Sequence, residues 1–228
     1  MMRLVHVRWA VTLTALLSVS AAIGLTAYAI VIKAQAQAIL RDISQLKVGV
    51  SSATDVAQLA ARHKNHWTEN CGPDGCNYYF AIRNRWLAGL RIEPEAVFQS
   101  SVAVDHDIVR SISVWIVRDT RVFPTMDSGG MIAEYVEYPT ERYRADQPHY
   151  GFPTPVGKPY LYVVLDSHAT AEQRQHAYAF SLTCLVKPGR GCDLPCDYLP
   201  LAWKDWESEL KSEGWKLEHY YPTYARCE

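Results

Sequence analysis

Cysteines are the residues of this chain with the clearest chemistry. There are six of them: Cys71, Cys76, Cys184, Cys192, Cys196 and Cys227. An even number of cysteines predicts a set of disulfides when the domain faces an oxidising compartment, because such compartments keep these bonds and the cytosol does not. Spacing favours pairing Cys71 with Cys76 and Cys184 with Cys192, which leaves Cys196 to join Cys227. Other connectivities remain open.

A zinc site is the alternative use of two of these cysteines. His63, His66, Cys71 and Cys76 lie close together in the sequence and would present two nitrogens and two sulfurs. Structural zinc sites usually place two cysteines about two to four residues apart and the two histidines at the far end. This spacing departs from that pattern. We therefore predict disulfides, with no metal and no cofactor.

Two short clusters contain the residue types of acid–base catalysis. Asp105-His106-Asp107 lies between two predicted strands, and a hairpin turn accounts for it because Asp tolerates turn conformations. Asp166-Ser167-His168 has the residues of a hydrolase triad, but adjacent positions rarely converge as a triad requires, and no G-x-S-x-G turn exposes the serine. No catalytic residue is predicted. A hydrolase that uses His149 or His168 with a carboxylate as general base is the alternative function.

A long irregular loop is predicted from Pro139 to Pro159, because this segment carries five prolines and no sustained period. Long loops in compact domains are often functional. Four aromatic or cationic side chains form our candidate contact for an anionic or sugar-like ligand: Tyr143, Arg144, His149 and Tyr150.

The elements that must position these residues begin with an uncharged apolar run from Trp9 to Ile32. The run exceeds the roughly 20 residues that a helix needs to cross a bilayer and the roughly 7–15 residues of a signal-peptide core. We predict a retained transmembrane helix. The alternative is a cleaved signal, with small-residue cleavage sites at 27–29 or 34–36.

The flanking charges and the cysteines predict the orientation of this helix. Two arginines precede the run and three cations follow it: Arg3 and Arg8, then Lys33, Arg41 and Lys47. The count is nearly balanced, but a very short leader with two arginines favours a cytoplasmic N-terminus. Cysteines confined to the far side favour an oxidising location there. We predict a cytoplasmic leader over residues 1–8 and an extracytoplasmic domain. A zinc-stabilised cytoplasmic domain with reversed orientation is a third hypothesis.

The rest of the chain predicts a stalk helix over residues 33–48 and one domain over residues 49–228. Alternating β-branched and aromatic runs predict strands at 77–83, 97–104, 108–118, 131–138 and 160–166, with a loop at 127–130. Capping patterns and helical spacing predict helices at 53–63, from 170 past 184, and at 203–211. The predicted fold is α+β: an N-terminal transmembrane helix, then an antiparallel sheet of about five strands packed by two or three helices.

The charge balance excludes nucleic acid as a partner. The chain has 23 Lys and Arg against 24 Asp and Glu, and no basic stripe or tail provides a footprint for phosphates. The membrane, through Trp9–Ile32, is the first predicted partner.

The segment from Leu46 to Val56 resembles the start of small bacterial envelope domains such as the outer-membrane assembly lipoprotein family, in which a helix precedes an antiparallel sheet. The chain has no lipid-accepting cysteine after its apolar run. Its layout, with Phe180–Leu185 ahead of a Gly-rich Cys192 loop, also resembles uncharacterised membrane-anchored bacterial proteins. The resemblance implies architecture only, and we predict a bacterial inner-membrane location. We therefore expect a non-enzymatic envelope module that binds a protein partner or a cell-wall component through its long loop or sheet edge.

Overall fold

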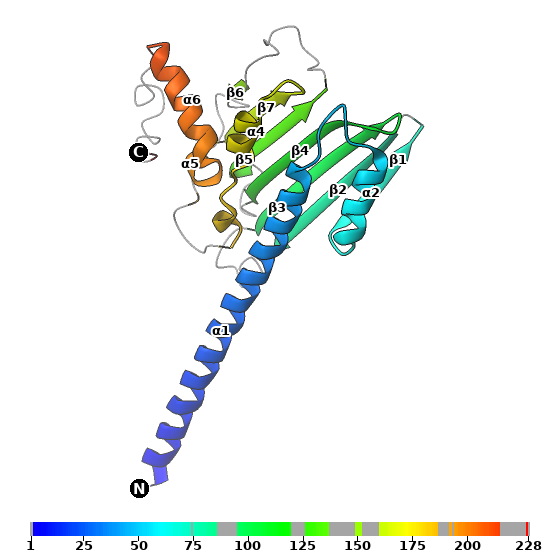
Figure 1. Cartoon of the computed structure of the whole chain (residues 1–228). Helices are drawn as coiled ribbons and strands as arrows, with labels where there is room; N and C mark the ends of the chain where they lie inside the picture. Colours follow the sequence, from blue (N-terminus) through cyan, green and yellow to red (C-terminus); the bar gives the residue numbers. More distant parts are fainter. Residues whose placement is uncertain are drawn as a thin grey trace.

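A computed structural model describes residues 2–73, 75–85, 95–119, 126–136, 149–151, 160–186, 192, 194–214 and 227. It consists of one long helix that projects from a mixed α/β body (Figure 1). The helix, α1, runs without interruption from Met2 to Ser44.

The two ends of α1 have different surroundings. The part from Val11 onward reaches a mean hydropathy of 2.1 and is long and apolar enough to cross a membrane. Leu13, Leu16 and Leu17 are each more than half exposed, so the first turns of this part make no protein core. The last turns behave differently, because Ile39 and Ile43 are fully buried against the body. Residues 33–48, expected as a stalk in water, are therefore helical to Ser44 and contribute to the core of the domain.

Seven strands form one sheet in the order β1-β2-β3-β4-β5-β7-β6. They are β1 (Trp67–Gly72), β2 (Gly75–Asn84), β3 (Glu95–Asp105), β4 (Ile108–Asp119), β5 (Met126–Tyr135), β6 (His149–Gly151) and β7 (Tyr160–Asp166). All neighbours pair antiparallel except β5 and β7, which are parallel. The predicted α+β class is confirmed. The sheet is larger than the expected five strands, because β1 and β6 add one strand at each edge.

One face of the sheet carries the core. Alternate residues along the strands point to this face, among them Phe80, Phe98, Ile112 and Ile132, each no more than 2% exposed. The helices on this face are α2 (Ala53–Arg62), α4 (Ala171–Ala177), the short 3₁₀ helix η1 (Leu182–Leu185), α5 (Pro195–Tyr198) and α6 (Pro200–Ser212). The helix expected at 203–211 lies within α6, where Trp203 and Trp206 are buried and Leu210 packs partly against the core.

Local sequence signals account for several element ends. Ser52 with Asp55 starts α2 and Thr170 with Gln173 starts α4, each as a full capping box. The hairpin between β3 and β4 turns at His106 and Asp107, both with positive φ, as a tight two-residue hairpin requires. The predicted turn at this position is confirmed.

Two predictions of local structure were wrong. The helix expected from residue 170 past residue 184 ends at Ala177, because the chain turns so that the Ser181 amide donates to the Tyr198 carbonyl in α5. The loop expected at 127–130 lies inside β5. Gly130 is there for close packing: a Cβ at this position would lie 2.9 Å from the Leu199 side chain.

Three disulfides are present: Cys71–Cys76, Cys184–Cys192 and Cys196–Cys227. This is the pairing that the sequence spacing favoured. The chain thus combines a helix able to cross a membrane with a disulfide-bonded α+β domain.

Candidate ligand-binding groove

An open groove of about 1210 Å³ runs along the domain part of α1. One wall is α1 from Lys33 to Ser44, and the other is formed by α4 and the segment that leads into η1. The eleven steps from Lys33 to Ser44 correspond to about 17 Å of helix length. The groove is therefore elongated, and it is large compared with the roughly 300–1,000 Å³ of typical small-molecule sites.

The position of α1 against the domain follows from its apolar stripe. Ile32, Ala36, Ile39 and Ile43 recur at spacings of three and four residues and are buried, so one face of the helix packs on the domain. The neighbouring face carries polar and charged residues such as Gln37 and Arg41, which line the groove. The helical spacing of apolar and polar residues in α1 therefore gives one face that packs on the domain and a neighbouring face that forms one wall of the groove.

A buried ion pair lies at the base of the groove. Glu134 of β5 is 2% exposed, and its Oε2 atom lies 3.1 Å from Nη2 of Arg174 in α4. The Tyr178 hydroxyl donates to the same Oε2 atom at 3.2 Å, and the Arg174 guanidinium lies 5.6 Å from the centre of the Tyr178 ring. Burial raises the pKa of Glu134, and the Arg174 charge and the Tyr178 hydroxyl oppose this rise. Burial also raises the pKa of Tyr178, with Glu134 as the next cause.

Arg174 also joins the base of the groove to the end of α1. Its Nη2 atom donates to the carbonyl oxygen of Leu46 at 2.8 Å and lies 3.4 Å from that of Ser44. Carbonyls at the end of a helix lack partners within the helix, and an arginine is a favourable donor for them. One guanidinium therefore connects strand β5, helix α4 and the C-terminus of α1.

The lining of the groove is cationic. Among its described residues there are four cations and one acid: Lys33, Arg41, Lys47 and Arg174, against Glu134. Since Glu134 is paired with Arg174, the three cations on the α1 side have no acid in the lining, although Arg41 Nε lies 3.5 Å from Oδ1 of the neighbouring Asp42. Six uncharged polar side chains supply hydrogen-bonding groups: Gln37, Ser44, Ser167, Gln175, Ser181 and Thr183. This chemistry suits an anionic ligand that also carries hydroxyl groups.

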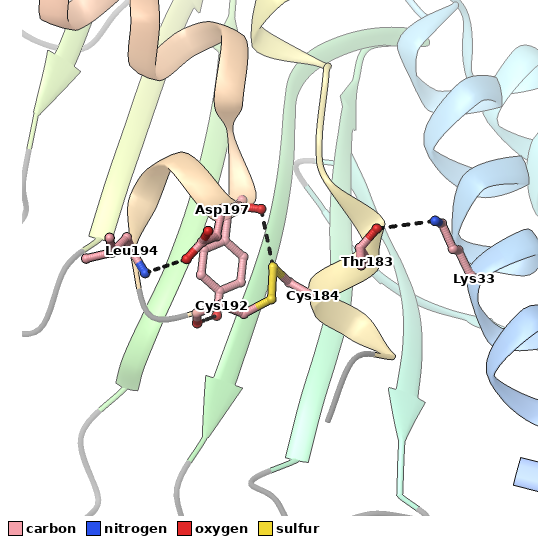
Figure 2. The surroundings of a disulfide bond; sticks show 7 residues. Lys33, Thr183, Cys184, Cys192, Leu194 and Asp197 are labelled. Carbon is pink, nitrogen blue, oxygen red and sulfur yellow. Dashed lines mark hydrogen bonds between the residues drawn. A yellow bond between two sulfur atoms is a disulfide. The ribbon is translucent and has the colours of Figure 1, made fainter. Parts of the chain in front are cut away.

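A disulfide holds the wall that faces Lys33. Figure 2 shows Cys184 of η1 bonded to Cys192, with Cys184 Sγ 3.2 Å from the Asp197 carbonyl oxygen. Next to Cys184, the Thr183 hydroxyl accepts a hydrogen bond from Lys33 Nζ at 3.3 Å across the groove. The covalent bond therefore ties the groove wall to the segment that carries α5.

The sequence-based ligand contact is only partly described. Tyr143 and Arg144 lie outside the described residues. His149 and Tyr150 begin β6, where their backbones pair with Val164 and Val163 of β7. The part of the predicted loop that is described is therefore an edge strand, and the contact itself stays a prediction.

The residues of the hydrolase hypothesis do not assemble as a triad around His168. Its Nδ1 atom lies 3.8 Å from Asp166 Oδ1, and its side chain is 77% exposed. The Ser167 hydroxyl donates to the Val136 carbonyl at 3.3 Å. The serine is therefore occupied in a turn and is not held by the histidine as a nucleophile would be.

Two other histidine–carboxylate pairs join helices. His63 Nε2 lies 3.0 Å from Asp42 Oδ2, which links the end of α2 to α1, and Asp42 is 6% exposed. His176 Nδ1 lies 2.8 Å from Asp205 Oδ2, which links α4 to α6. Both pairs link two packed helices, so we assign them a role in holding these helices together.

The four residues of the zinc alternative are not brought together. Cys71 and Cys76 are bonded to each other at the tip of the β1–β2 hairpin, next to Glu69. His63 is occupied by Asp42 at the opposite end of β1. Six strand residues at about 3.3 Å each separate the two ends, which is too far for one metal ion.

Glu134, Arg174 and Tyr178 were not predicted as site residues. Arg174 and Tyr178 are four residues apart on a predicted helix, so their common face was visible. Glu134 has the same parity as Ile132 in β5, which places both on the core face. A charged residue at a core-facing strand position was the available signal for this site.

No protein-family model matches the chain, and no curated protein or solved structure matches it significantly. The resemblance of Leu46–Val56 to envelope domains therefore stays a prediction.

Proposed function

We propose that the chain is a single-pass membrane protein of the bacterial cell envelope, with residues 1–8 in the cytoplasm and the disulfide-bonded domain outside it. The apolar length of α1 and three disulfides in the domain support this topology. The arginines of the leader support the orientation.

The domain acts as a non-enzymatic binding module for an anionic component of the envelope. The observation that carries this proposal is the cationic lining of an elongated groove, in which Lys33 and Lys47 have no acidic counterpart among the described lining residues and Arg41, paired with Asp42 at 3.5 Å, keeps a side chain that is 70% exposed. Cations in a concave site with low-dielectric walls raise the local concentration of anions.

Intact mass of the membrane-extracted protein, alkylated before and after reduction, tests the topology. We expect a full-length mass and no alkylation before reduction. Alkylation of all six cysteines without reduction would place the domain in a reducing compartment. A mass lower by about 30 residues would identify a cleaved signal.

Binding of short-chain polyphosphate to the full-length protein in detergent tests the module. We expect salt-sensitive binding that is weakened when Lys33, Arg41 and Lys47 are all changed to Gln. A matched variant with the same charge change uses three exposed cations away from the groove: Lys64, Arg110 and Lys204. Equal loss in the two variants would mean that net charge alone attracts the anion, and the groove would not be the site.

A further inference from the structure

One end of the groove lies where α1 leaves the domain toward its apolar part. Lys33 is the first charged residue after the apolar run, and Ile32 directly before it is 7% exposed. Tyr28, one turn earlier and within the apolar run, also packs partly against the core. The domain therefore contacts α1 inside the segment able to cross a membrane, and no spacer separates the two.

This contact determines where the Lys33 end of the groove lies relative to a bilayer. When the apolar run spans a bilayer, charged side chains at its end lie at the lipid headgroups. Lys33 and Thr183, whose side chains meet across the groove, then face the headgroup layer. Ile30 and Val31, each more than half exposed, are directed away from the domain and remain available to lipid tails.

The far end of the groove lies beyond the reach of a compact headgroup. Lys47 lies past the end of α1, about 17 Å or more from Lys33 along the helix axis. Between them, the lining offers cations and uncharged hydrogen-bonding groups, while Leu40 and Phe180 are at least nine-tenths buried. The exposed apolar residue of the lining, Val50, follows Lys47 in the sequence. The space between the two lysines therefore suits a long polar group.

We infer that the ligand is a membrane lipid with an elongated, hydroxyl-rich anionic headgroup, which lies along the groove from Lys33 to Lys47 while its tails stay in the bilayer. This inference rests on the proposed function of the groove as an anion site. It adds the source of the anion, which is the membrane beside α1.

Lysine acetylation footprinting of the full-length protein in nanodiscs tests this inference. The probes are phosphatidylcholine alone, phosphatidylcholine with phosphatidylglycerol, and phosphatidylcholine with phosphatidylinositol 4-phosphate, whose headgroup is longer and richer in hydroxyls. We expect phosphatidylinositol 4-phosphate to slow acetylation at both Lys33 and Lys47, and phosphatidylglycerol to protect Lys33 only. Lys64 and Lys204, exposed elsewhere on the domain, are internal references.

The Lys47→Gln variant provides a second measurement that does not depend on footprinting. Loss of one cation near a membrane surface should weaken binding of phosphatidylinositol 4-phosphate about five-fold and leave binding of phosphatidylglycerol unchanged. Lys64→Gln should change neither. Lys47 is exposed, so the substitution leaves the core intact.

Two results would overturn the inference. Protection of Lys33 alone by both lipids would show that the groove does not hold an elongated headgroup. Equal protection by the water-soluble headgroup, glycerophosphoinositol 4-phosphate, would show that the lipid is not needed. If the protein still binds polyphosphate in either case, the proposed anion site remains supported. If it binds neither the lipids nor polyphosphate, the proposed anion site is refuted as well.

Discussion

Replacing Arg174 by methionine should strongly destabilise the domain. The substitution keeps an unbranched side chain in α4 and removes the donor that reaches Glu134 Oε2 and the carbonyls of Ser44 and Leu46. Because Glu134 is 2% exposed, its carboxylate would then be buried with only the Tyr178 hydroxyl as partner. Breaking a buried pair in this way costs about 3–5 kcal/mol of unfolding free energy. The full effect is expected at pH values above the raised pKa of Glu134, where the carboxylate is charged.

The cost of Arg174→Met should depend on pH with a definite sign. In the native protein the pKa of Glu134 is raised above 4.5, so the folded state binds this proton more tightly than the unfolded state. Its contribution to stability is therefore fully present below the unfolded pKa and is lost as pH rises through the folded pKa. Without Arg174, which lowers this pKa, the loss should extend to higher pH. The variant should be closest to the native protein near pH 5 and fall further behind as pH rises.

Urea unfolding of the oxidised protein in detergent, followed by tryptophan fluorescence at several pH values, measures both effects. The double variant Glu134→Gln/Arg174→Met should recover about 1–3 kcal/mol relative to the sum of the single variants and lose the pH dependence. Arg110→Met is the control, because Arg110 is 52% exposed and its pair with Asp105 contributes at most about 1 kcal/mol. A cost of Arg174→Met as small as that of the control, at all pH values, would refute the reasoning.

Three further predictions concern packing, backbone and covalent structure. Gly130→Ala should cost about 1–3 kcal/mol, because the new methyl group meets the Leu199 side chain at 2.9 Å; an unchanged urea midpoint would mean that α5 moves away freely. Gly49→Ala should cost about 1 kcal/mol through its positive φ of 75° alone, and thermal unfolding should show no loss if that strain is absent. Removing the Cys184–Cys192 disulfide with the double Ala variant should cost roughly 2.5 kcal/mol and weaken polyphosphate binding; full binding by the folded variant would show that the groove wall does not need this bond.

Local signals in the sequence were sufficient for most of the fold. The strand at 160–166 was predicted with the bounds that β7 has, because its apolar run is short and continuous. The start of α2 followed from Ser52 and Asp55, whose side chains act within three residues of each other. The parallel pairing of β5 with β7 was not predicted, because it joins strands separated by a long connection and no local pattern encodes which neighbours a strand acquires.

The groove depended on information that local patterns do not contain. The composition of the segment after Lys33 predicts a helix in water, whereas the spacing of Ile39, Ile43 and Leu46 indicates the buried stripe that the structure has. Arg174 lies in a predicted helix, but its contact with the Leu46 carbonyl depends on how α1 docks. Sites formed between distant elements follow from tertiary packing, and a capping or hydrophobic pattern specifies only the elements.

The absence of any break in α1 between its apolar part and the domain has a mechanical consequence. A helix of this length is a rod of about 64 Å, and its last turns are fixed to the sheet through Ile39, Ile43 and Arg174. Tilt of the apolar part, as in a thinner bilayer, would therefore swing the entire sheet about the membrane surface as one lever. Rotation of α1 about its own axis would likewise determine which strands face neighbouring proteins. With the apolar part in a bilayer, the orientation of the domain would thus be set by the lipid that surrounds the helix.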